Sequence, residues 1–77
     1  MILRIRRIFR EVFDDDQLDV SDELSPRDLP AWDSLAQVKL LLALEEEFGV
    51  QFTIVEAAEL RSVGDFQRAL ASKHSPV

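Results

Sequence analysis

Apolar residues recur at helical spacing along most of this chain. Residues 2–13 carry isoleucine, phenylalanine and valine side chains every three or four positions, and residues 34–48 and 63–72 show a similar repeat. A shorter helix is expected over about residues 54–60. No apolar–polar alternation is long enough to build a sheet, so the pattern predicts an all-α four-helix bundle.

Polar residues and a glycine mark where these helices begin and end. Residues 14–16 are all aspartate, and negative charge is unfavourable at a helix C-terminus. Gly49 suits the position just after a helix. Thr53 followed by Glu56 matches a capping box, and Ser62 is a candidate cap for the last helix. Each boundary therefore has a local chemical cause.

Residues 14–33 form a long polar segment between the first two helices. A loop of this length is uncommon in a small domain and is more often functional than not. Scattered aliphatic residues are expected to pin it to the core: Leu18, Val20, Leu24 and Leu29.

Composition limits the chemistry open to this chain. Its 77 residues are expected to form one domain, ending in a polar tail at 73–77. There is no cysteine, and the only histidine, His74, lies in that tail, so a thiolate nucleophile or a zinc site is not expected. No stretch approaches the roughly 20 apolar residues of a membrane-spanning helix. We therefore expect no stable membrane insertion.

Charge is unevenly distributed. The net charge is −6, which argues against nucleic-acid binding. Residues 1–13 carry +3, whereas residues 14–77 carry −9. The basic first helix is read as a solvated face, and a docking role for it is a hypothesis only; its arginines are Arg4, Arg6, Arg7 and Arg10.

The predicted helix over residues 34–48 has two apolar faces. One is the expected core stripe, and Leu35, Val38 and Leu42 lie nearly opposite to it. Either the first loop covers this second face, an alternative weighed evenly for Val38, or partner proteins contact it, the reading preferred for Leu35 and Leu42. Three acidic side chains beside it would steer basic partners: Glu45, Glu46 and Glu47.

Ser34 has two compatible interpretations. With Gln37 it matches a capping box, and Asp33 favours the same helix end. Alternatively, its hydroxyl is a place to attach a phosphate-linked arm, because a helix N-terminus favours an anion. A serine hydrolase is not expected, since no G-x-S-x-G elbow is present.

Three motifs, with the spacing between them, resemble the acyl carrier protein family: residues 32–38 (WDSLAQV), 44–50 (LEEEFGV) and 62–66 (SVGDF). The resemblance implies a bundle of the acyl-carrier type and a non-enzymatic protein. It implies that a phosphopantetheinyl transferase attaches 4′-phosphopantetheine from coenzyme A to Ser34, with Asp33 assisting transferase recognition. The arm's thiol, absent from the chain itself, would then carry a thioester. The resemblance also implies that partner enzymes contact Leu35, Val38, Leu42, Glu45, Glu46 and Glu47.

Two departures from the family's pattern narrow this expectation. Carriers of fatty-acid synthesis usually have glycine two residues before the Asp-Ser pair, where this chain has Ala31. They also usually have acids near the positions that Ala36 and Lys39 occupy here. The WDSL signature of residues 32–35 is more like that of carriers dedicated to special or secondary pathways. We therefore expect a discrete, monomeric, cytoplasmic carrier of a specialised or secondary pathway, served by acyl-loading and acyl-using enzymes. An aminoacyl or peptidyl carrier and an unmodified helical interaction module remain as alternatives. The cargo, and whether it is buried between the helices, stays open.

Overall fold

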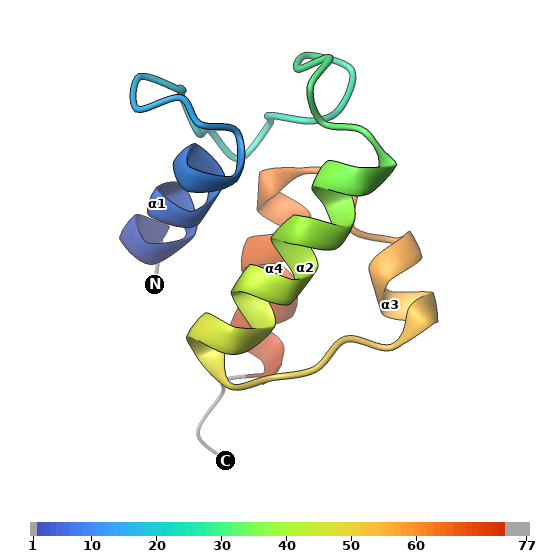
Figure 1. The fold of residues 1–77 in the computed structure, drawn as a ribbon. Coiled ribbons are helices and arrows are strands. Elements are labelled where there is room, and N and C mark those ends of the chain that lie inside the picture. Colours follow the sequence, from blue (N-terminus) through green and yellow to red (C-terminus); the bar gives the residue numbers. More distant parts are fainter. Residues whose placement is uncertain (1, 74–77) are drawn as a thin grey trace.

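The computed structural model describes residues 2–73, which form four helices and no strand. They are α1 (Ile2–Val12), α2 (Ser34–Phe48), α3 (Ile54–Ala58) and α4 (Val63–Lys73). Figure 1 shows α2 crossing the middle of the molecule, with α4 behind it, α1 on one side and the short α3 on the other. The predicted all-α architecture, with its long first loop and short third helix, is confirmed.

Three helix ends differ from the prediction. Helix α1 stops at Val12, because Asp14 turns into the left-handed region at φ 51°. Helix α3 stops at Ala58 rather than at residue 60, since its last backbone bonds span three residues instead of four. Helix α4 includes Lys73, whose ammonium pairs with Glu56 at 2.8 Å. The remainder of the expected tail, including His74, lies outside the described residues.

The predicted caps at Gly49, Thr53 and Ser62 are present. Gly49 adopts φ +66° and its N–H donates to the carbonyl of Glu45. Thr53 and Glu56 form the reciprocal capping box, with bonds of 3.1 and 2.8 Å. The hydroxyl of Ser62 accepts from the backbone N–H of Asp65 at 3.1 Å. Local sequence therefore determines these helix ends.

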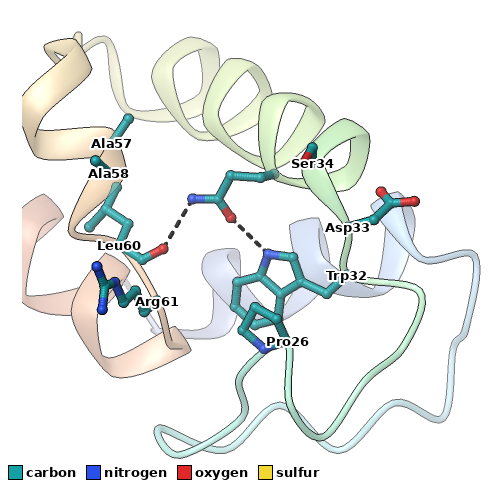
Figure 2. Close-up of a pocket in the computed structure, with 9 residues that line it drawn as sticks. Pro26, Trp32, Asp33, Ser34, Ala57, Ala58, Leu60 and Arg61 are labelled. Carbon is teal, nitrogen blue, oxygen red and sulfur yellow. Dashed lines mark hydrogen bonds between the residues drawn. The ribbon is translucent and has the colours of Figure 1, made fainter.

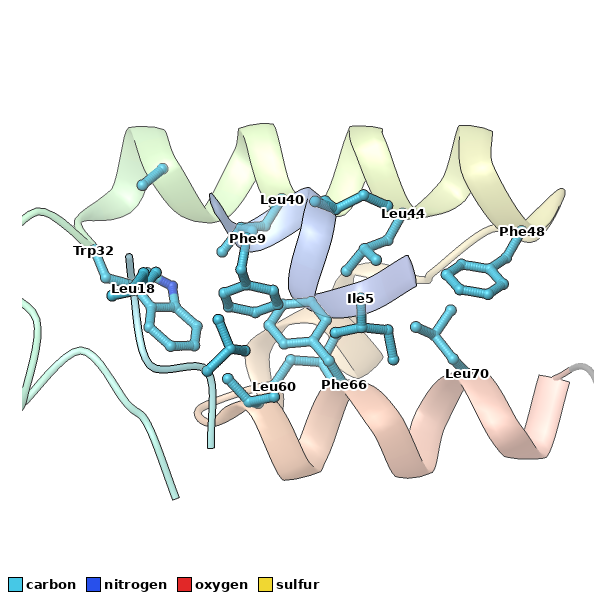
Figure 3. Packing of buried hydrophobic residues seen from close by; sticks show 14 residues of the cluster. Ile5, Phe9, Leu18, Trp32, Leu40, Leu44, Phe48, Leu60, Phe66 and Leu70 are labelled. Carbon is cyan, nitrogen blue, oxygen red and sulfur yellow. The ribbon is translucent and has the colours of Figure 1, made fainter. Parts of the chain in front are cut away.

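Apolar side chains from α1, α2 and α4 meet in a single core (Figure 3). Phe9 packs edge-on against Trp32 and Phe66, with ring centroids 5.4 and 5.8 Å apart. Such aromatic contacts stabilise beyond their buried area. The buried core residues are Ile5, Ile8, Phe9, Leu18, Val20, Trp32, Ala36, Leu40, Leu44, Phe48, Leu60, Val63, Phe66 and Leu70.

The first half of the first loop is fastened to the core and to α4. Leu18 and Val20 are buried in the core. Farther along, the carbonyl of Asp22 accepts from the N–H of Gly64 at 2.9 Å. A Cβ on Gly64 would lie 3.1 Å from that carbonyl, so glycine allows the loop to approach α4 closely. The loop is therefore fixed against the core and α4 before it reaches the start of α2.

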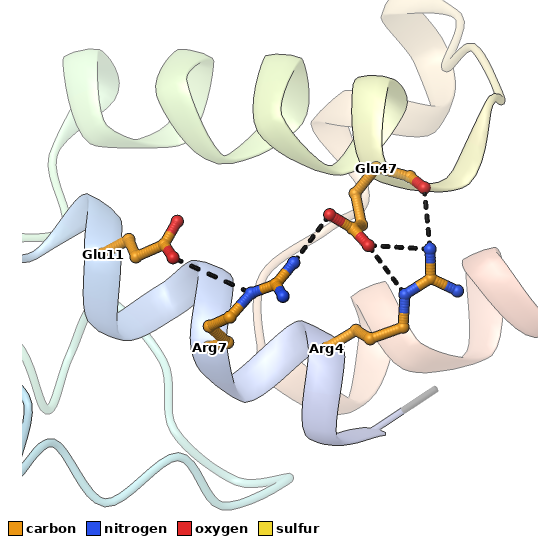
Figure 4. Close-up of polar contacts among 4 residues, drawn as sticks. All are labelled: Arg4, Arg7, Glu11 and Glu47. Atoms are coloured by element: carbon orange, nitrogen blue, oxygen red, sulfur yellow. Dashed lines mark hydrogen bonds and ion pairs between the residues drawn. The ribbon is translucent and has the colours of Figure 1, made fainter.

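Helix α1 is held to the end of α2 by charge. The guanidinium groups of Arg4 and Arg7 each lie 2.7 Å from a carboxylate oxygen of Glu47, and Arg4 also stacks over the Phe48 ring at 4.6 Å (Figure 4). Arg10 donates to the carbonyl of Leu18 at 3.0 Å. These three arginines thus have partners within the fold, which leaves less of the basic face for docking.

Candidate functional site

Ser34 is the first residue of α2, and the cap of that helix is Asp33. The Oδ1 atom of Asp33 accepts from the backbone N–H of Ala36 at 2.9 Å, and its carbonyl accepts from the N–H of Gln37. The predicted Ser34–Gln37 capping box is therefore wrong: Asp33 is extended and meets the first turn, one residue earlier than expected. Within the described residues, the exposed hydroxyl of Ser34 has no hydrogen-bond partner.

Gln37 has a different role from the one predicted. Its Oε1 accepts from the indole Nε1–H of Trp32 at 2.7 Å, and its Nε2 donates to the carbonyl of Leu60 at 3.1 Å (Figure 2). We call this pair of bonds the Trp32–Gln37–Leu60 bridge. It joins the start of α2 to the segment between α3 and α4. The sequence held one signal for it, because a buried indole N–H needs an acceptor.

An open cleft of about 470 Å³ lies beside Ser34. Side chains from the first loop, the start of α2, α3 and the α3–α4 connection line it (Figure 2). The residues are Pro26, Trp32, Asp33, Ser34, Gln37, Ala57, Ala58, Leu60 and Arg61. A group attached to the Ser34 oxygen would begin at the edge of this cleft.

The second apolar face of α2 is open to solvent. Leu35, Val38 and Leu42 are 62%, 50% and 60% exposed. The alternative in which the first loop covers this face is therefore wrong. Ile54 and Val55 of α3 are also exposed, an apolar surface that the sequence analysis did not anticipate. Exposed aliphatic side chains in such numbers are typical of surfaces that contact other proteins.

The three glutamates at the end of α2 do not act as one group. Glu46 is exposed, whereas the carboxylate of Glu45 accepts from the backbone N–H of Phe52 at 2.8 Å. Glu47 is paired with α1, and its hydrogen bond from Arg4 holds the pKa of that carboxyl below its usual value. Of these carboxylates, Glu46 alone is both exposed and uncommitted among the described residues.

The residues around Ser34 fit a phosphate-linked group. The hydroxyl is exposed, it stands at the N-terminus of a 15-residue helix, and the cleft begins beside it. Backbone N–H groups at such an end lack intrahelical partners and favour negative charge. Within the described residues, no group of histidine, cysteine or carboxylate side chains could hold a metal ion. No described helix has the length and apolar character needed to cross a membrane.

Comparison with known proteins identifies the family of the chain. The sequence model of a family described as "Phosphopantetheine attachment site" matches residues 3–70. An acyl carrier protein from Caulobacter vibrioides (strain NA1000 / CB15N) is 34% identical over 70 residues, which cover 91% of this chain and 90% of that protein.

Solved structures show the same relationship. The solution structure of holo acyl carrier protein from Geobacter metallireducens matches with a TM-score of 0.81 and 39% identity, over 87% of this chain and 77% of that one. A Mycobacterium tuberculosis structure, provisionally assigned as an acyl carrier protein, has a TM-score of 0.80 at 24% identity, over 88% and 90% of the two chains. The second match, at that identity, shows the fold alone.

These findings define the class first: a small helical protein that carries covalently attached 4′-phosphopantetheine and is not an enzyme. Within that class, the chain belongs to the acyl carrier protein family. Proteins of this family interact with the enzymes that modify them and with enzymes that handle acyl groups.

Proposed function

We propose that Ser34 is the attachment residue and that the chain carries an acyl unit for a specialised biosynthetic pathway. The observation that carries this is the exposed hydroxyl at the start of α2, which has no hydrogen-bond partner in the described part of the chain. Its modification would break no contact of the fold. The attached group would supply the thiol that this cysteine-free chain lacks.

The attachment reaction is a phosphoryl transfer from coenzyme A. A bond forms between Ser34 Oγ and the phosphorus bearing the pantetheine arm, as the pyrophosphate bond of coenzyme A breaks. Adenosine 3′,5′-bisphosphate leaves, and the serine proton is released. Asp33 holds the first turn of α2 in place during this step through its bond to Ala36 N–H. We also propose that the transferase reads the exposed Asp33 side chain.

We propose that partner enzymes bind the second apolar face of α2. Leu35, Val38 and Leu42 supply exposed aliphatic surface, and Glu46 supplies an uncommitted negative charge beside them. Glu45 and Glu47 also lie at this end of α2 and are part of the proposed partner contact. Their carboxylates already have partners within the fold, so they supply less free charge than Glu46. Apolar contacts surrounded by charge suit specific but transient association.

The specialised pathway rests on what the front of α2 lacks. Where fatty-acid carriers usually have acids near the front of this helix, the chain has the buried Ala36 and the exposed Lys39. The tryptophan of the WDSL motif carries less weight, because Trp32 has a structural role in the core. We also propose that the protein is a cytoplasmic monomer, on the ground of its membership in the acyl carrier protein family.

The attachment residue is tested by intact mass. The purified chain is incubated with coenzyme A and a broad-specificity phosphopantetheinyl transferase. We expect a gain of one phosphopantetheinyl group, which Ser34→Ala abolishes. The matched control is Ser72→Ala, an exposed serine on α4, which keeps the gain. No gain, under conditions that modify another carrier, would favour an unmodified interaction module. Selective loading with an amino acid by its pathway enzyme would instead identify an aminoacyl carrier.

A further inference from the structure

The cleft beside Ser34 reaches the outer edge of the core, since two of its lining residues, Trp32 and Leu60, belong to the core cluster. None of its lining residues belongs to the set of described side chains that are essentially unexposed, such as Leu40, Val63 and Phe66. Its most buried lining residues, which we call the wall, are Trp32 and Leu60, at 3% and 7% exposed, with Gln37 hydrogen-bonded to both. Figure 2 shows the two hydrogen bonds of the Trp32–Gln37–Leu60 bridge, which link Trp32 to Leu60 through Gln37.

Behind this wall the space is filled. The indole of Trp32 is 3% exposed and contacts the rings of Phe9 and Phe66, at centroid distances of 5.4 and 6.2 Å. Phe52 packs edge-on against Phe66 from the other side, at 6.5 Å. Protein interiors are close-packed, so an inserted chain would have to move the Trp32 ring, which its hydrogen bond to Gln37 holds in position.

We propose that the Trp32–Gln37–Leu60 bridge is a latch that keeps the cargo in the outer cleft, which suits short acyl units and excludes long alkyl chains from the core. This rests on Ser34 being the attachment residue. Opening the latch would leave the indole N–H of Trp32 and the carbonyl of Leu60 unpaired at buried positions, which is costly. A short unit avoids that cost.

The outer cleft has the surface that such a unit needs. Ala57 and Ala58 line it with the smallest side chains that still bear a Cβ, so the space beside the wall stays wide. Pro26 and Leu60 add apolar surface, and the guanidinium of Arg61 adds a donor. A few carbon atoms with one polar group would be partly covered there, while their thioester would remain within reach of partner enzymes.

The length of the attached acyl group tests the latch. Acylated protein is made by a transferase that moves the acyl-phosphopantetheine arm from butyryl- or decanoyl-coenzyme A to Ser34, and intact mass confirms each product. We expect the two thioesters to react with hydroxylamine at rates within about twofold, because neither is sequestered. The melting temperatures should agree within about 2 °C, and the indole N–H resonance of Trp32, the only tryptophan, should not move.

The inference is overturned if decanoyl protein melts about 5 °C or more above butyryl protein, as burial of the extra methylene groups would cause, and the Trp32 resonance shifts. Gln37→Ala removes the latch. In that variant we expect the decanoyl thioester, and not the butyryl one, to become several-fold slower to react with hydroxylamine, as a chain that enters the core becomes protected. Lys39→Ala is the matched control, an exposed residue of α2 away from the wall, and it should behave as wild type.

Failure of the proposed attachment gives a different result. If no mass gain occurs, Ser34 is not the attachment residue. The latch is then tested alone on Ser34→Cys, whose thiol is unique because the chain has no other cysteine, linked by a disulfide to butyl or decyl groups. Equal melting temperatures and an unmoved Trp32 resonance would support the latch. A decyl group that stabilises the protein and moves the resonance would refute it.

Discussion

At the scale of single residues, the start of α2 divides two tasks between neighbours. Asp33 satisfies a backbone N–H of the first turn, and Ser34 leaves its hydroxyl exposed. In a capping serine, the oxygen to be modified would also be the one that binds the helix N–H. Because Asp33 caps instead, the modification of Ser34 and the integrity of the helix are independent.

The division of tasks predicts opposite effects on stability. Asp33→Ala should destabilise the fold by about 1 kcal/mol, the usual cost of losing an N-cap. Ser34→Ala should change the free energy of unfolding by less than about 0.5 kcal/mol, as expected for an exposed position without such a contact. Urea denaturation measures both. A loss in Ser34→Ala as large as that in Asp33→Ala would contradict the assignment of the cap.

At the scale of helices, α1 is fastened to α2 by two arginines that share one carboxylate. Arg4 and Arg7 bind different oxygens of Glu47, and Arg7 also lies 3.7 Å from Glu11 (Figure 4). The pKa of Glu47 is lowered chiefly by its hydrogen bond from Arg4. The folded protein therefore binds a proton at this carboxyl more weakly than the unfolded chain does.

This lowered pKa predicts how the α1–α2 contact responds to pH. The stabilisation from Glu47 is complete above the ordinary glutamate pKa of about 4.3 and is lost as the pH falls through the lowered value. Glu47→Gln should thus melt a few degrees below wild type at neutral pH, and the two curves should converge in acid. Glu46→Gln, an exposed neighbour, is the control and should follow wild type throughout. A gap for Glu47→Gln that persists in acid would show that the ion pair is not its cause.

The exposed apolar face of α2 predicts a loss of recognition without a loss of fold. Leu35→Ala and Leu42→Ala should each lower the kcat/KM of the transferase about tenfold, which corresponds to about 1.4 kcal/mol of contact energy. Leu3→Ala on α1, at a comparably exposed leucine, should have little effect. Steady-state kinetics measures this difference. Equal losses at Leu3 and Leu42 would mean that the transferase does not select the α2 face.

At the scale of the whole molecule, local signals and long-range contacts differ in what the sequence could predict. Gly49, Thr53 and Ser62 each cap a helix through neighbours within a few residues, so a pattern sufficed to find them. The bond between Gln37 and Leu60 joins residues 23 positions apart, and no local pattern encodes it. Likewise, the sequence pattern predicts Glu47 in a docking rim. Its pairing with Arg4 joins residues 43 positions apart, so no local pattern reveals it.

Net charge also acts on the molecule as a whole, and it predicts a salt dependence. The chain carries −6, while its longest dimension is 36 Å. The screening length is about 30 Å at 0.01 M salt and about 8 Å at 0.15 M. At the lower salt, most of the acids repel one another across the molecule; at the higher, only near neighbours interact.

Added salt should therefore raise the melting temperature by several degrees between about 0.01 and 0.15 M, because long-range repulsion is lost while the 2.7 Å pairs of Glu47 persist. A divalent cation should act at lower concentration. Thermal unfolding followed by circular dichroism measures the change. Lys39→Glu, which makes the net charge more negative at an exposed site, should steepen the dependence, whereas Glu46→Lys should flatten it. A melting temperature that falls with salt would show that the α1–α2 ion pairs outweigh the repulsion.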